Sequence, residues 1–375
     1  MNIILDYVVR LNQEMTEFLY GGVCGYEGGV MMREENNRSE KVRAPRNQTL
    51  TLSPEEEIFY RNKLLRLQQA ATVDEIVNRT ICGDLLEVVN FLPDAFVDLL
   101  ILDPPYNLDK DFHGSLFKER DHKQYLAYVE TWFSKLIRLL KPTASVYLCG
   151  DWNSTAALYL VLDKYMIVRN RITWQREKGR GALRNWKNCS EDIWFATVSD
   201  EYTFNVDAVK MKRRVIAPYR KDGQPKDWEE TEDGNFRITY PSNFWDDITI
   251  PYWSMPENTD HPTQKPEKLI AKLILASSNP GDIVLDPFLG SGTTSVVAAK
   301  LGRRYCGIEQ NIQYCCWAEK RLDLAREDKS IQGYADGVFW ERNTLNLQKR
   351  MNNLRKLTKT PAKQAGLFLL ESEPR

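Results

Sequence analysis

The fold is decided by one stretch, Phe96-Val97-Asp98-Leu99-Leu100-Ile101-Leu102-Asp103-Pro104-Pro105-Tyr106. Its first seven residues form a short, mostly apolar run that is rich in branched side chains, which is typical of a buried strand. The two prolines cannot extend a strand ladder, so the strand is predicted to end before them. Asp103 and Tyr106 then lie at the carboxyl edge of a sheet, where open α/β sheets bind ligands. A strand-ending turn with a solvated carboxylate explains an isolated segment of this kind equally well, so the rest of the chain must decide.

The composition indicates a protein of a reducing compartment. The 375 residues suffice for one large domain or two smaller ones. The formal net charge of −1 does not by itself indicate a nucleic-acid partner. The seven cysteines form no metal-type pairs and no disulfide framework, and no metal site is predicted. The N-terminus lacks a signal-peptide pattern, and no apolar run is long enough to cross a bilayer. We therefore expect a cytoplasmic protein without a membrane partner.

Strands and helices alternate around the opening stretch. Strands are expected near residues 81–83, 144–149 and 167–174, and helices at residues 85–90, 125–140 and 154–162. Pro142 is expected to stop the second of these helices. Alternation of this kind predicts a doubly wound parallel sheet. Trp174, near the end of its strand, is either a wall of the ligand site or an ordinary core residue.

The alternation is lost between residues 175 and 255, where aromatic residues stand among basic ones. Basic side chains neutralise phosphates and aromatic rings stack on bases, so this segment is a candidate substrate-recognition insert. Taken alone, an ordinary solvated insert explains the composition slightly better. The residues that we single out as candidates for binding nucleic acid are Arg180, Arg184, Trp186, Lys187, Lys212, Arg213 and Arg214.

A second ligand-binding pattern is Asp286-Pro287-Phe288-Leu289-Gly290-Ser291-Gly292-Thr293, between an expected strand and an expected helix. The glycines let the backbone approach a ligand, and the helix N-terminus offers unpaired amides. Glu309 follows the next strand about twenty residues after Gly290, at a position from which an acid bonds ribose hydroxyls. Asp286 precedes the glycines, and a carboxylate there suits a cationic ligand better than a pyrophosphate. This favours S-adenosylmethionine over a nicotinamide cofactor.

Three segments together resemble the signature of the beta class of DNA amino-methyltransferases. They are residues 103–106, His261-Pro262-Thr263-Gln264-Lys265-Pro266 and residues 286–293, with the catalytic motif before the cofactor motif. The resemblance covers most of residues 76–325 and leaves the recognition insert and both ends uncovered. It implies the Rossmann-like methyltransferase fold, with a seven-stranded sheet whose last strand is antiparallel. The order of segments implies a circular permutation, which leaves the packed core unchanged.

The resemblance also implies a role for each matching residue. S-adenosylmethionine would be bound by Asp84, Leu85, Asp103, Thr263, Lys265, Asp286, Phe288, Gly290, Ser291, Gly292, Thr293, Glu309 and Gln310. In that arrangement Glu309 bonds the ribose, Asp84 bonds the adenine amine, and Lys265 binds the methionine carboxylate together with its neighbour Thr263. The implied catalytic residues are Asp103, Pro104, Pro105 and Tyr106.

The chemistry expected at this site is methylation of an exocyclic amine. Such an amine is a poor nucleophile because its lone pair is delocalised into the base. Asp103 and the carbonyl of Pro104 would accept its hydrogens and favour a tetrahedral nitrogen that attacks the sulfonium methyl in line. Tyr106 would stack on a base that has been flipped out of the duplex.

The target base and the partners are expectations of the same resemblance. In this family, Asp at the first motif position accompanies N6-adenine more often, and Ser accompanies N4-cytosine, so Asp103 favours adenine. N4-cytosine is the alternative because the amine chemistry is the same. An RNA or protein amine methyltransferase and a non-catalytic DNA-binding module are less favoured. Double-stranded DNA is the expected partner, with a homodimer and a cognate restriction endonuclease as candidates, in nucleoid-associated cytoplasm.

The expected chain organisation has five parts. Residues 1–75 form a helical extension with a mobile basic loop, 76–174 the catalytic half, 175–255 the target-recognition insert, 256–330 the cofactor-binding half, and 331–375 a tail. The whole interpretation requires that Asp103 and Asp286, far apart in the chain, lie side by side and face one cleft.

Overall fold

The central element of the protein is an eight-stranded sheet of order β1-β15-β14-β2-β5-β7-β6-β13. The structure is a computed structural model, and it describes residues 44–176, 183–215, 219–231, 234–342 and 344. The chain divides into two compact units, Met1–Pro45 and Arg46–Arg375, and every element below lies in the second. Among the described residues, no helix combines the length and apolar character needed to cross a membrane.

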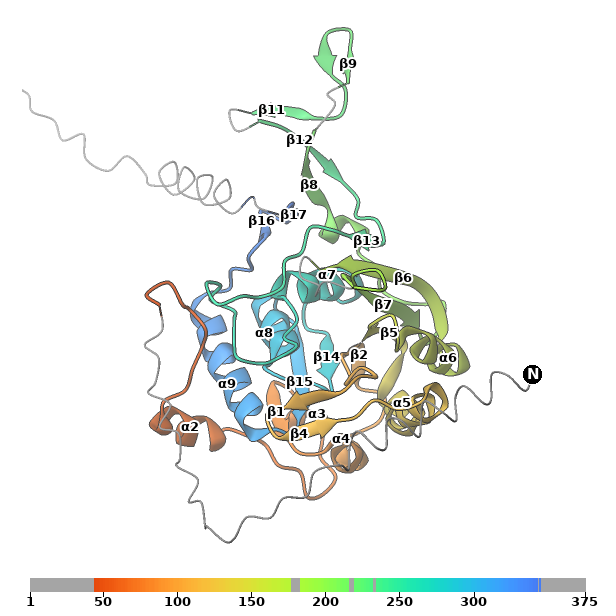
Figure 1. Ribbon diagram of the computed structural model, residues 1–375, viewed down its shortest axis with the longest axis vertical. Helices are drawn as coiled ribbons and strands as arrows, with labels where there is room; N and C mark the ends of the chain where they lie inside the picture. The colour runs from red at the N-terminus through yellow and green to blue at the C-terminus, as the bar shows by residue number, and fades with distance from the viewer. Residues whose placement is uncertain (1–43, 177–182, 216–218, 232–233, 343, 345–375) are drawn as a thin grey trace, which may run out of the picture. The chain divides into compact units, whose positions relative to one another are not determined.

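The sheet has the predicted doubly wound, permuted order. Its strands are β1 (Arg79–Cys82), β2 (Val97–Leu102), β5 (Leu140–Gly150), β6 (Ile167–Gln175), β7 (Ser190–Thr197), β13 (Phe244–Trp245), β14 (Ile283–Asp286) and β15 (Arg304–Glu309). The late strands β14 and β15 lie between the early strands β1 and β2, all in parallel (Figure 1). β7 is antiparallel to both of its neighbours, β5 and β6. The additional strand β13, parallel to β6, brings the expected seven strands to eight.

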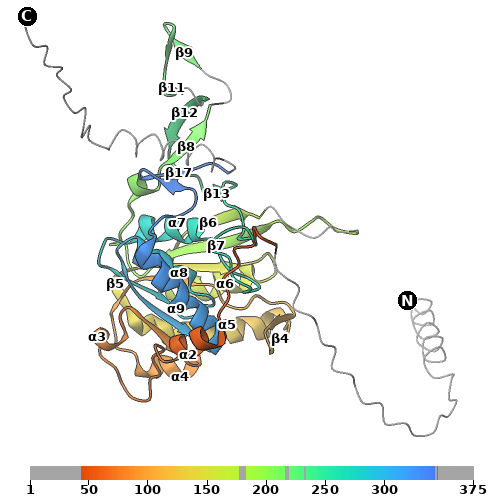
Figure 2. The same cartoon turned by 90° about the vertical axis from the view of Figure 1, so that its left-hand side faces the viewer.

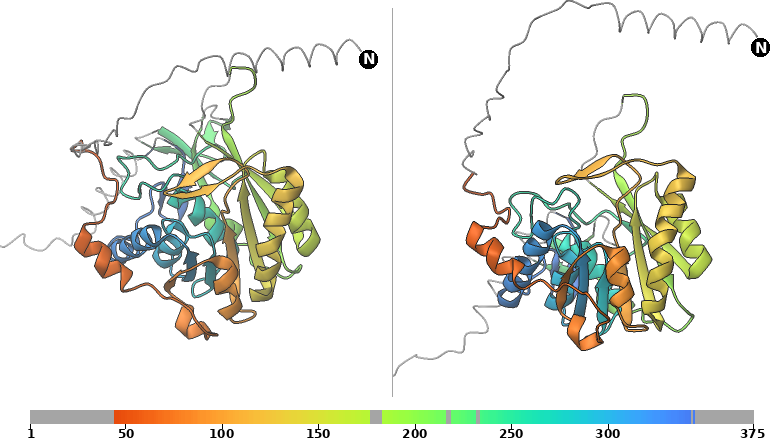
Figure 3. Two further views of the ribbon diagram at one scale, coloured as in Figure 1. Left: turned by 60° about the horizontal axis from the view of Figure 1, so that its bottom comes forward. Right: turned by 90° about the horizontal axis from the view of Figure 1, so that it is seen from below.

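Helices cover both faces of the sheet because successive strand residues point to opposite sides. On β2, Leu100 and Leu102 enter one apolar core, whereas Leu99 and Ile101 enter another. The first core is closed by α3 (Val73–Ile76), α4 (Leu85–Val88), α5 (His122–Leu136) and α6 (Thr155–Tyr165). The second is closed by α7 (Glu267–Ser277), α8 (Thr293–Lys300) and α9 (Ile312–Glu327). Figure 3 shows the yellow α5 and the blue α9 on opposite sides of the sheet.

The helix expected at residues 125–140 ends earlier than predicted. α5 stops at Leu136, a 3-10 turn η2 (Ile137–Leu139) follows, and Pro142 lies inside β5. The partners of β2 change from Leu140, opposite Val97, to Ser145, opposite Leu99, so the residues between Leu140 and Ser145 bulge out of the ladder. Bulged residues need no ladder hydrogen bond, which is why a proline is tolerated there.

β7 was predicted to be part of the recognition insert, but it completes the central sheet between β5 and β6. The sheet therefore continues past residue 175, the expected start of the insert. The apolar run of β7 directly follows a basic segment, and the composition of that segment concealed the strand. Trp174 is a core residue: it is 1% exposed, and its Nε1 donates to the carbonyl of Ile248 at 3.0 Å.

A smaller sheet combines the recognition insert with residues expected in the tail. Its order is β11-β12-β8-β17-β16, and β17 runs parallel to β8 (Figure 2). The strands are β8 (Met211–Arg214), β11 (Glu229–Thr231), β12 (Gly234–Thr239), β16 (Tyr334–Ala335) and β17 (Val338–Trp340). A hairpin of β9 (Arg220–Lys221) and β10 (Gln224–Pro225) lies between β8 and β11 in the chain. The expected N-terminal extension up to residue 43 and the tail from residue 345 lie outside the described residues.

Candidate active site

The strand ends that carry Asp103 and Asp286 meet in the structure. β2 and β14 are neighbouring parallel strands, with Leu100 opposite Leu285. Parallel neighbours end at the same edge of a sheet, so the two acids lie side by side. Both line one cavity of about 640 Å³. The central spatial expectation of the sequence is confirmed.

The Asp286 side of the cavity carries two carboxylates that are held by neutral donors. Asp286 accepts hydrogen bonds from the Thr294 hydroxyl at 2.6 Å and from the Phe288 amide at 3.0 Å. Glu309 accepts from the amides of Gly290 at 2.9 Å and Asn311 at 2.7 Å. Burial raises the pKa of Asp286 to about 7 and also raises the pKa of Glu309. Within the described part of the chain, neither carboxylate forms an ion pair, so both would be stabilised by a cationic or hydroxyl-rich ligand.

Nearly all the residues predicted to bind the cofactor line this one cavity. They are Asp84, Leu85, Asp103, Thr263, Lys265, Asp286, Phe288, Gly290, Ser291, Thr293, Glu309 and Gln310. The exception is Gly292, which does not line it. Gly292 has φ 88° at the start of α8, and a Cβ there would lie 2.5 Å from the Cβ of Ala318 on α9. This glycine therefore serves helix packing, and its contact with the cofactor stays a prediction.

Gly290, in contrast, is required by the cavity itself. Its φ is 54°, and a Cβ would lie 2.9 Å from Nε2 of His261, so the backbone passes directly beneath that ring. The His261 ring lies 4.5 Å from the ring of Tyr314, and its Nδ1 accepts a hydrogen bond from the Thr263 amide at 3.3 Å. Burial and the neighbouring Lys265 lower the pKa of His261 to about 3. His261 is therefore a neutral wall of the cavity at physiological pH.

On the catalytic side, the carboxylate of Asp103 is bound by a cation. Nζ of Lys265 donates to both carboxylate oxygens at 2.7 Å, and the Tyr106 hydroxyl lies 3.0 Å from Oδ1. Burial raises the pKa of Asp103, and Lys265 opposes this rise. Burial disfavours the ammonium of Lys265, but Asp103 and Glu191 overcome that effect and raise its pKa. The sequence predicted that Lys265 contacts the cofactor carboxylate, whereas the structure places its ammonium on Asp103.

Glu191 on β7 is part of this cluster and was missed by the sequence analysis. Its Oε2 accepts a hydrogen bond from the Tyr106 hydroxyl at 2.9 Å and lies 3.3 Å from Nζ of Lys265. Its Oε1 lies 2.7 Å from Nη1 of Arg176, and its side chain is only 6% exposed. One signal was available: Glu191 alternates with Ile193 and Phe195, so it shares their buried face.

The Asp-Pro-Pro-Tyr turn is fixed by hydrogen bonds from elements on either side. The Tyr125 hydroxyl of α5 donates to the carbonyl of Pro105 at 3.0 Å. The amide of Asn107 donates to the Ser154 hydroxyl at 2.9 Å. The side chain of Asn107 exchanges two hydrogen bonds of 2.8 Å with the backbone of Arg120. The turn is thus held before any ligand binds, which favours precise positioning of its groups.

Residues 107–124 contain a hairpin. It consists of β3 (Lys110–Phe112) and β4 (Ser115–Phe117), joined by His113 and Gly114 at φ 51° and 97°. Positive φ at both turn residues is typical of a tight hairpin. The His113 ring packs edge-on against Tyr314 and Trp317 of α9, at 5.4 and 6.0 Å. Because Lys110 and His113 also line the cavity, the hairpin forms part of its wall.

The candidate nucleic-acid residues fall into two groups. Arg180 lies outside the described residues. Arg184, Trp186 and Lys187 are exposed in the segment before β7, and Trp186 is 96% exposed. The other three are successive residues of β8: Lys212, Arg213 and Arg214.

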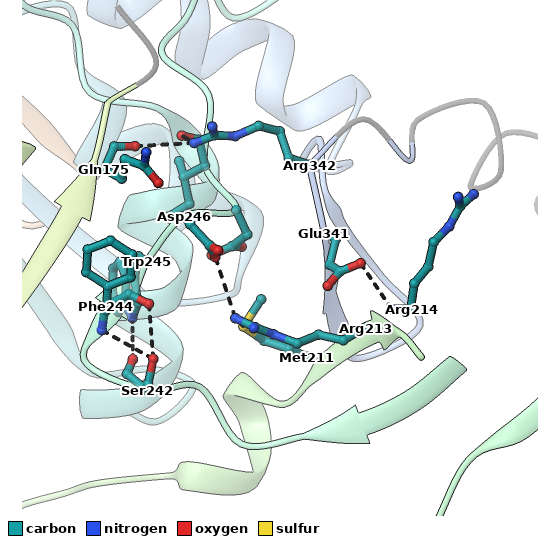
Figure 4. A network of polar contacts seen from close by, with 12 residues as sticks. Gln175, Met211, Arg213, Arg214, Ser242, Phe244, Trp245, Asp246, Glu341 and Arg342 are labelled. Carbon is teal, nitrogen blue, oxygen red and sulfur yellow. Dashed lines mark hydrogen bonds and ion pairs between the residues drawn. The ribbon is translucent and has the colours of Figure 1, made fainter. Parts of the chain in front are cut away.

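On β8 the three basic residues have different surroundings. The ammonium of Lys212 lies over the rings of Phe236 and Trp340, 5.1 and 4.9 Å from their centroids. Arg213 lies 3.6 Å from Asp246 and is directed toward it (Figure 4). The backbone amide of Arg214 donates to Glu341 at 3.0 Å, and its side chain extends away into an exposed position (Figure 4). Of the three, Arg214 is therefore the most accessible to a ligand.

Comparisons with known proteins identify the family of this chain. A family model described as DNA methylase matches residues 97–320. The chain is 35% identical over 248 residues to the Type II methyltransferase M.HpaI of Haemophilus parainfluenzae, covering 65% of this chain and 74% of that protein. It is 36% identical over 252 residues to the DNA adenine methyltransferase YhdJ of Escherichia coli (strain K12), and the match covers 65% of this chain and 82% of that protein. A solved structure, that of the M1.HpyAVI-SAM complex, matches with a TM-score of 0.46 and 23% sequence identity. The match covers 65% of this chain and 98% of that chain. The chain belongs to the DNA methylase family.

Proposed function

We propose that this protein transfers a methyl group from S-adenosylmethionine to the N6 amine of an adenine in double-stranded DNA. The observation that carries the proposal is that Asp103 and Asp286 line one cavity. The first belongs to the segment that resembles the catalytic motif of the family, and the second to the segment that resembles its cofactor motif. Adenine is supported by Asp at the first motif position and by the 36% identity to a protein named a DNA adenine methyltransferase.

The chemistry of the donor set fits S-adenosylmethionine, which carries a sulfonium, an ammonium and a ribose but no phosphate. Asp286 is a buried carboxylate without a cationic partner in the described chain, and would face the cationic methionine part. Glu309 would bond the ribose hydroxyls, and Gln310 would lie beside the adenine. Asp84 and Leu85 line the same cavity at the position where the family bonds the adenine amine. When bound, this cofactor supplies an electrophilic methyl group.

The catalytic residues act by accepting hydrogen bonds and by positioning. Asp103 and the carbonyl of Pro104 accept the hydrogens of the target amine, so that the nitrogen lone pair becomes available for attack. The prolines hold these acceptors rigidly, and the hydrogen bond from Tyr125 to the carbonyl of Pro105 fixes the turn. Tyr106 stacks on the flipped base. Positioning of this kind can supply most of the rate enhancement because the reacting atoms are held in line.

DNA binding is assigned to the basic segment before β7 and to β8. Exposed Arg184 and Lys187 would neutralise phosphates, exposed Trp186 would stack or wedge at a base step, and Arg214 would extend the contact. A homodimer and a cognate restriction endonuclease are further partners compatible with this activity, in nucleoid-associated cytoplasm. Light scattering with and without duplex DNA measures the oligomeric state directly.

Product analysis tests the proposed function. The protein is incubated with methyl-labelled S-adenosylmethionine and duplex DNA, RNA or protein, and the DNA is then digested to nucleosides for mass spectrometry. We expect label in duplex DNA and in N6-methyladenine. Label in N4-methylcytosine would establish the cytosine alternative, and label only in RNA or protein would overturn the assignment to DNA.

A further inference from the structure

We propose that Glu191 is a positioning residue for methyl transfer: it shares the ammonium of Lys265 with Asp103 and thereby keeps Asp103 a strong acceptor for the target amine. This inference rests on the proposed function of the same site. It goes beyond that function because it assigns a task to a residue outside all three motif segments.

The geometry places Glu191 in contact with the catalytic motif through two partners. Its Oε2 lies 3.3 Å from Nζ of Lys265, the same atom that donates to both oxygens of Asp103 at 2.7 Å. The same Oε2 accepts a hydrogen bond from the Tyr106 hydroxyl at 2.9 Å, and that hydroxyl lies 3.0 Å from Asp103. Lys265 and Tyr106 are therefore each held between two carboxylates, and neither can shift without losing a contact to Glu191.

The charges of the cluster balance. Asp103 and Glu191 contribute two negative charges, and Lys265 and Arg176 contribute two positive charges. The side chains of Lys265 and Glu191 are 8% and 6% exposed, so each charge depends on its partners rather than on water. Arg176, at 2.7 Å from Oε1, occupies the far side of Glu191 and leaves Oε2 for the catalytic groups.

The effect on Asp103 follows from competition for Lys265. A carboxylate whose two oxygens both bind an ammonium is a weaker acceptor for other donors, because the cation withdraws charge from it. A second carboxylate that shares this ammonium reduces the withdrawal. Lys265 thus keeps Asp103 ionised, while Glu191 preserves its strength as an acceptor. Without Glu191, the ammonium of Lys265 would bind Asp103 alone, and Asp103 would become a weaker acceptor.

The same arrangement predicts a characteristic pH dependence. The titratable groups facing Asp103 are Lys265, Glu191, Tyr106, Cys149, Tyr125 and Asp286. Burial contributes most to the raised pKa of Asp103, Lys265 lowers the pKa, and Glu191 raises it. Transfer requires ionised Asp103, so activity falls as the pH drops through its pKa. Neutralising Glu191 would lower the pKa of Asp103. The acid limb of the rate profile, which is the pH range where activity falls as Asp103 becomes protonated, would then move to lower pH.

The test compares Glu191→Gln with the matched control Asp192→Asn. Gln keeps the shape of the side chain and removes its charge. Asp192 is the next residue of β7 and points to the other face, where it accepts from the Thr173 hydroxyl at 2.9 Å. For both variants, single-turnover methyl transfer to duplex DNA is measured across pH, together with cofactor affinity and melting temperature.

We expect Glu191→Gln to lower the single-turnover rate by roughly ten- to a hundredfold and to move the acid limb to lower pH, with unchanged cofactor affinity. Asp192→Asn should retain the wild-type rate and profile. A second variant, Glu191→Asp, keeps the charge on a shorter arm, so its rate should fall less and its acid limb should stay in place.

Two results would overturn the inference. One is Glu191→Gln with the wild-type rate and acid limb. The other is a lower rate with an unmoved acid limb and a lower melting temperature, which would show a purely structural role. If Glu191→Gln does not fold, Glu191→Ala, which also removes the charge, decides: the wild-type rate together with the wild-type acid limb would refute the inference. Failure of the proposed function is recognised separately, because the wild-type protein would then not methylate DNA.

Discussion

Asp286 and Asp103 occupy equivalent places at the ends of adjacent parallel strands, yet their surroundings differ. Asp286 is held by a hydroxyl and a backbone amide, and no ion pair with it occurs in the described chain. Asp103 is held by the ammonium of Lys265, which has a second carboxylate partner in Glu191. When Asp286 is ionised, its charge is therefore not neutralised by the protein, whereas the charge of Asp103 is.

This difference indicates how one sheet edge can serve two partners. A buried carboxylate without a cation favours a cationic ligand, which fits the cofactor. A carboxylate fixed by an ion pair gains little from a cation but retains lone pairs that accept neutral N–H donors, which fits the target amine. The contrast between Asp286 and Asp103 therefore separates cofactor binding from amine polarisation within a single cavity.

Among the variants that leave Asp103 in place, the largest effect is expected from Lys265→Met, which removes the cation on the Asp103 side. The transfer rate should fall on the order of a hundredfold at neutral pH, because Asp103 loses the charge that opposes the rise in its pKa. The acid limb should therefore move to higher pH, opposite to the shift expected for Glu191→Gln. The unpaired carboxylates should also cost about 3–5 kcal/mol of unfolding free energy.

Single-turnover rates across pH and urea unfolding check both parts of this prediction. An acid limb at the wild-type position in Lys265→Met would show that Asp103 and Asp286 do not differ in the way described.

On the Asp286 side, Gly292→Ala tests the packing of the glycine turn. The added Cβ would lie 2.5 Å from the Cβ of Ala318 at φ 88°, so the unfolding free energy should fall by about 3 kcal/mol. Gly302→Ala is the matched control: φ is 75°, but no atom lies within 4 Å of the added Cβ. Its cost should be about 1 kcal/mol, from backbone strain alone. Equal losses in thermal or urea unfolding would contradict the assigned role of Gly292.

Asp286→Asn should weaken cofactor binding about tenfold, because the amide retains an acceptor oxygen but loses the charge. The pKa of Asp286 is raised to about 7, and a cationic ligand binds the ionised form. In the wild-type protein, affinity should therefore rise as the pH increases from 6 to 8, and the variant should lose this dependence. Calorimetric titration with S-adenosylmethionine measures both. The same pH dependence in the variant would exclude Asp286 as the group that titrates.

The smallest effect is expected far from both acids, at the start of helix α2 (Pro54–Arg61). The Ser53 hydroxyl accepts from the Glu56 amide at 3.2 Å, and the Glu56 carboxylate accepts from the Ser53 amide at 2.9 Å. This reciprocal cap satisfies amides at the start of the helix. Ser53→Ala should cost about 1 kcal/mol of stability in urea unfolding and leave the transfer rate unchanged. A lower rate would show that α2 contributes to the site.

The strand ends and the cofactor turn were predictable from sequence because their signals are local. Prolines at 104 and 105 end β2, and an acid before a glycine turn marks the end of β14. The signals of helix α7 (Glu267–Ser277) are local as well, because a turn on either side and one apolar face define it. Signals of this kind need only neighbouring residues.

The contacts that distinguish the two acids were not predictable because they join distant residues. Lys265 lies 162 residues from Asp103 in the chain, and Tyr106 lies 85 residues from Glu191. β7 was concealed by the basic segment before it, so the buried acid at its start was read as part of an exposed insert. β17 likewise pairs with β8 across the whole cofactor half, which no local pattern signals. Pro142 was predicted to end a helix, but it lies in a bulge of β5, where no ladder hydrogen bond is needed.

The most direct measurement compares methyl transfer and cofactor binding in Asp103→Ala with the wild-type protein. Each protein is titrated with S-adenosylmethionine, and each is assayed with labelled cofactor and duplex DNA. We predict that the variant loses at least about a thousandfold in transfer rate while its cofactor affinity changes by less than about threefold. A variant that still methylates DNA near the wild-type rate would contradict the assignment of Asp103 as the acceptor for the target amine.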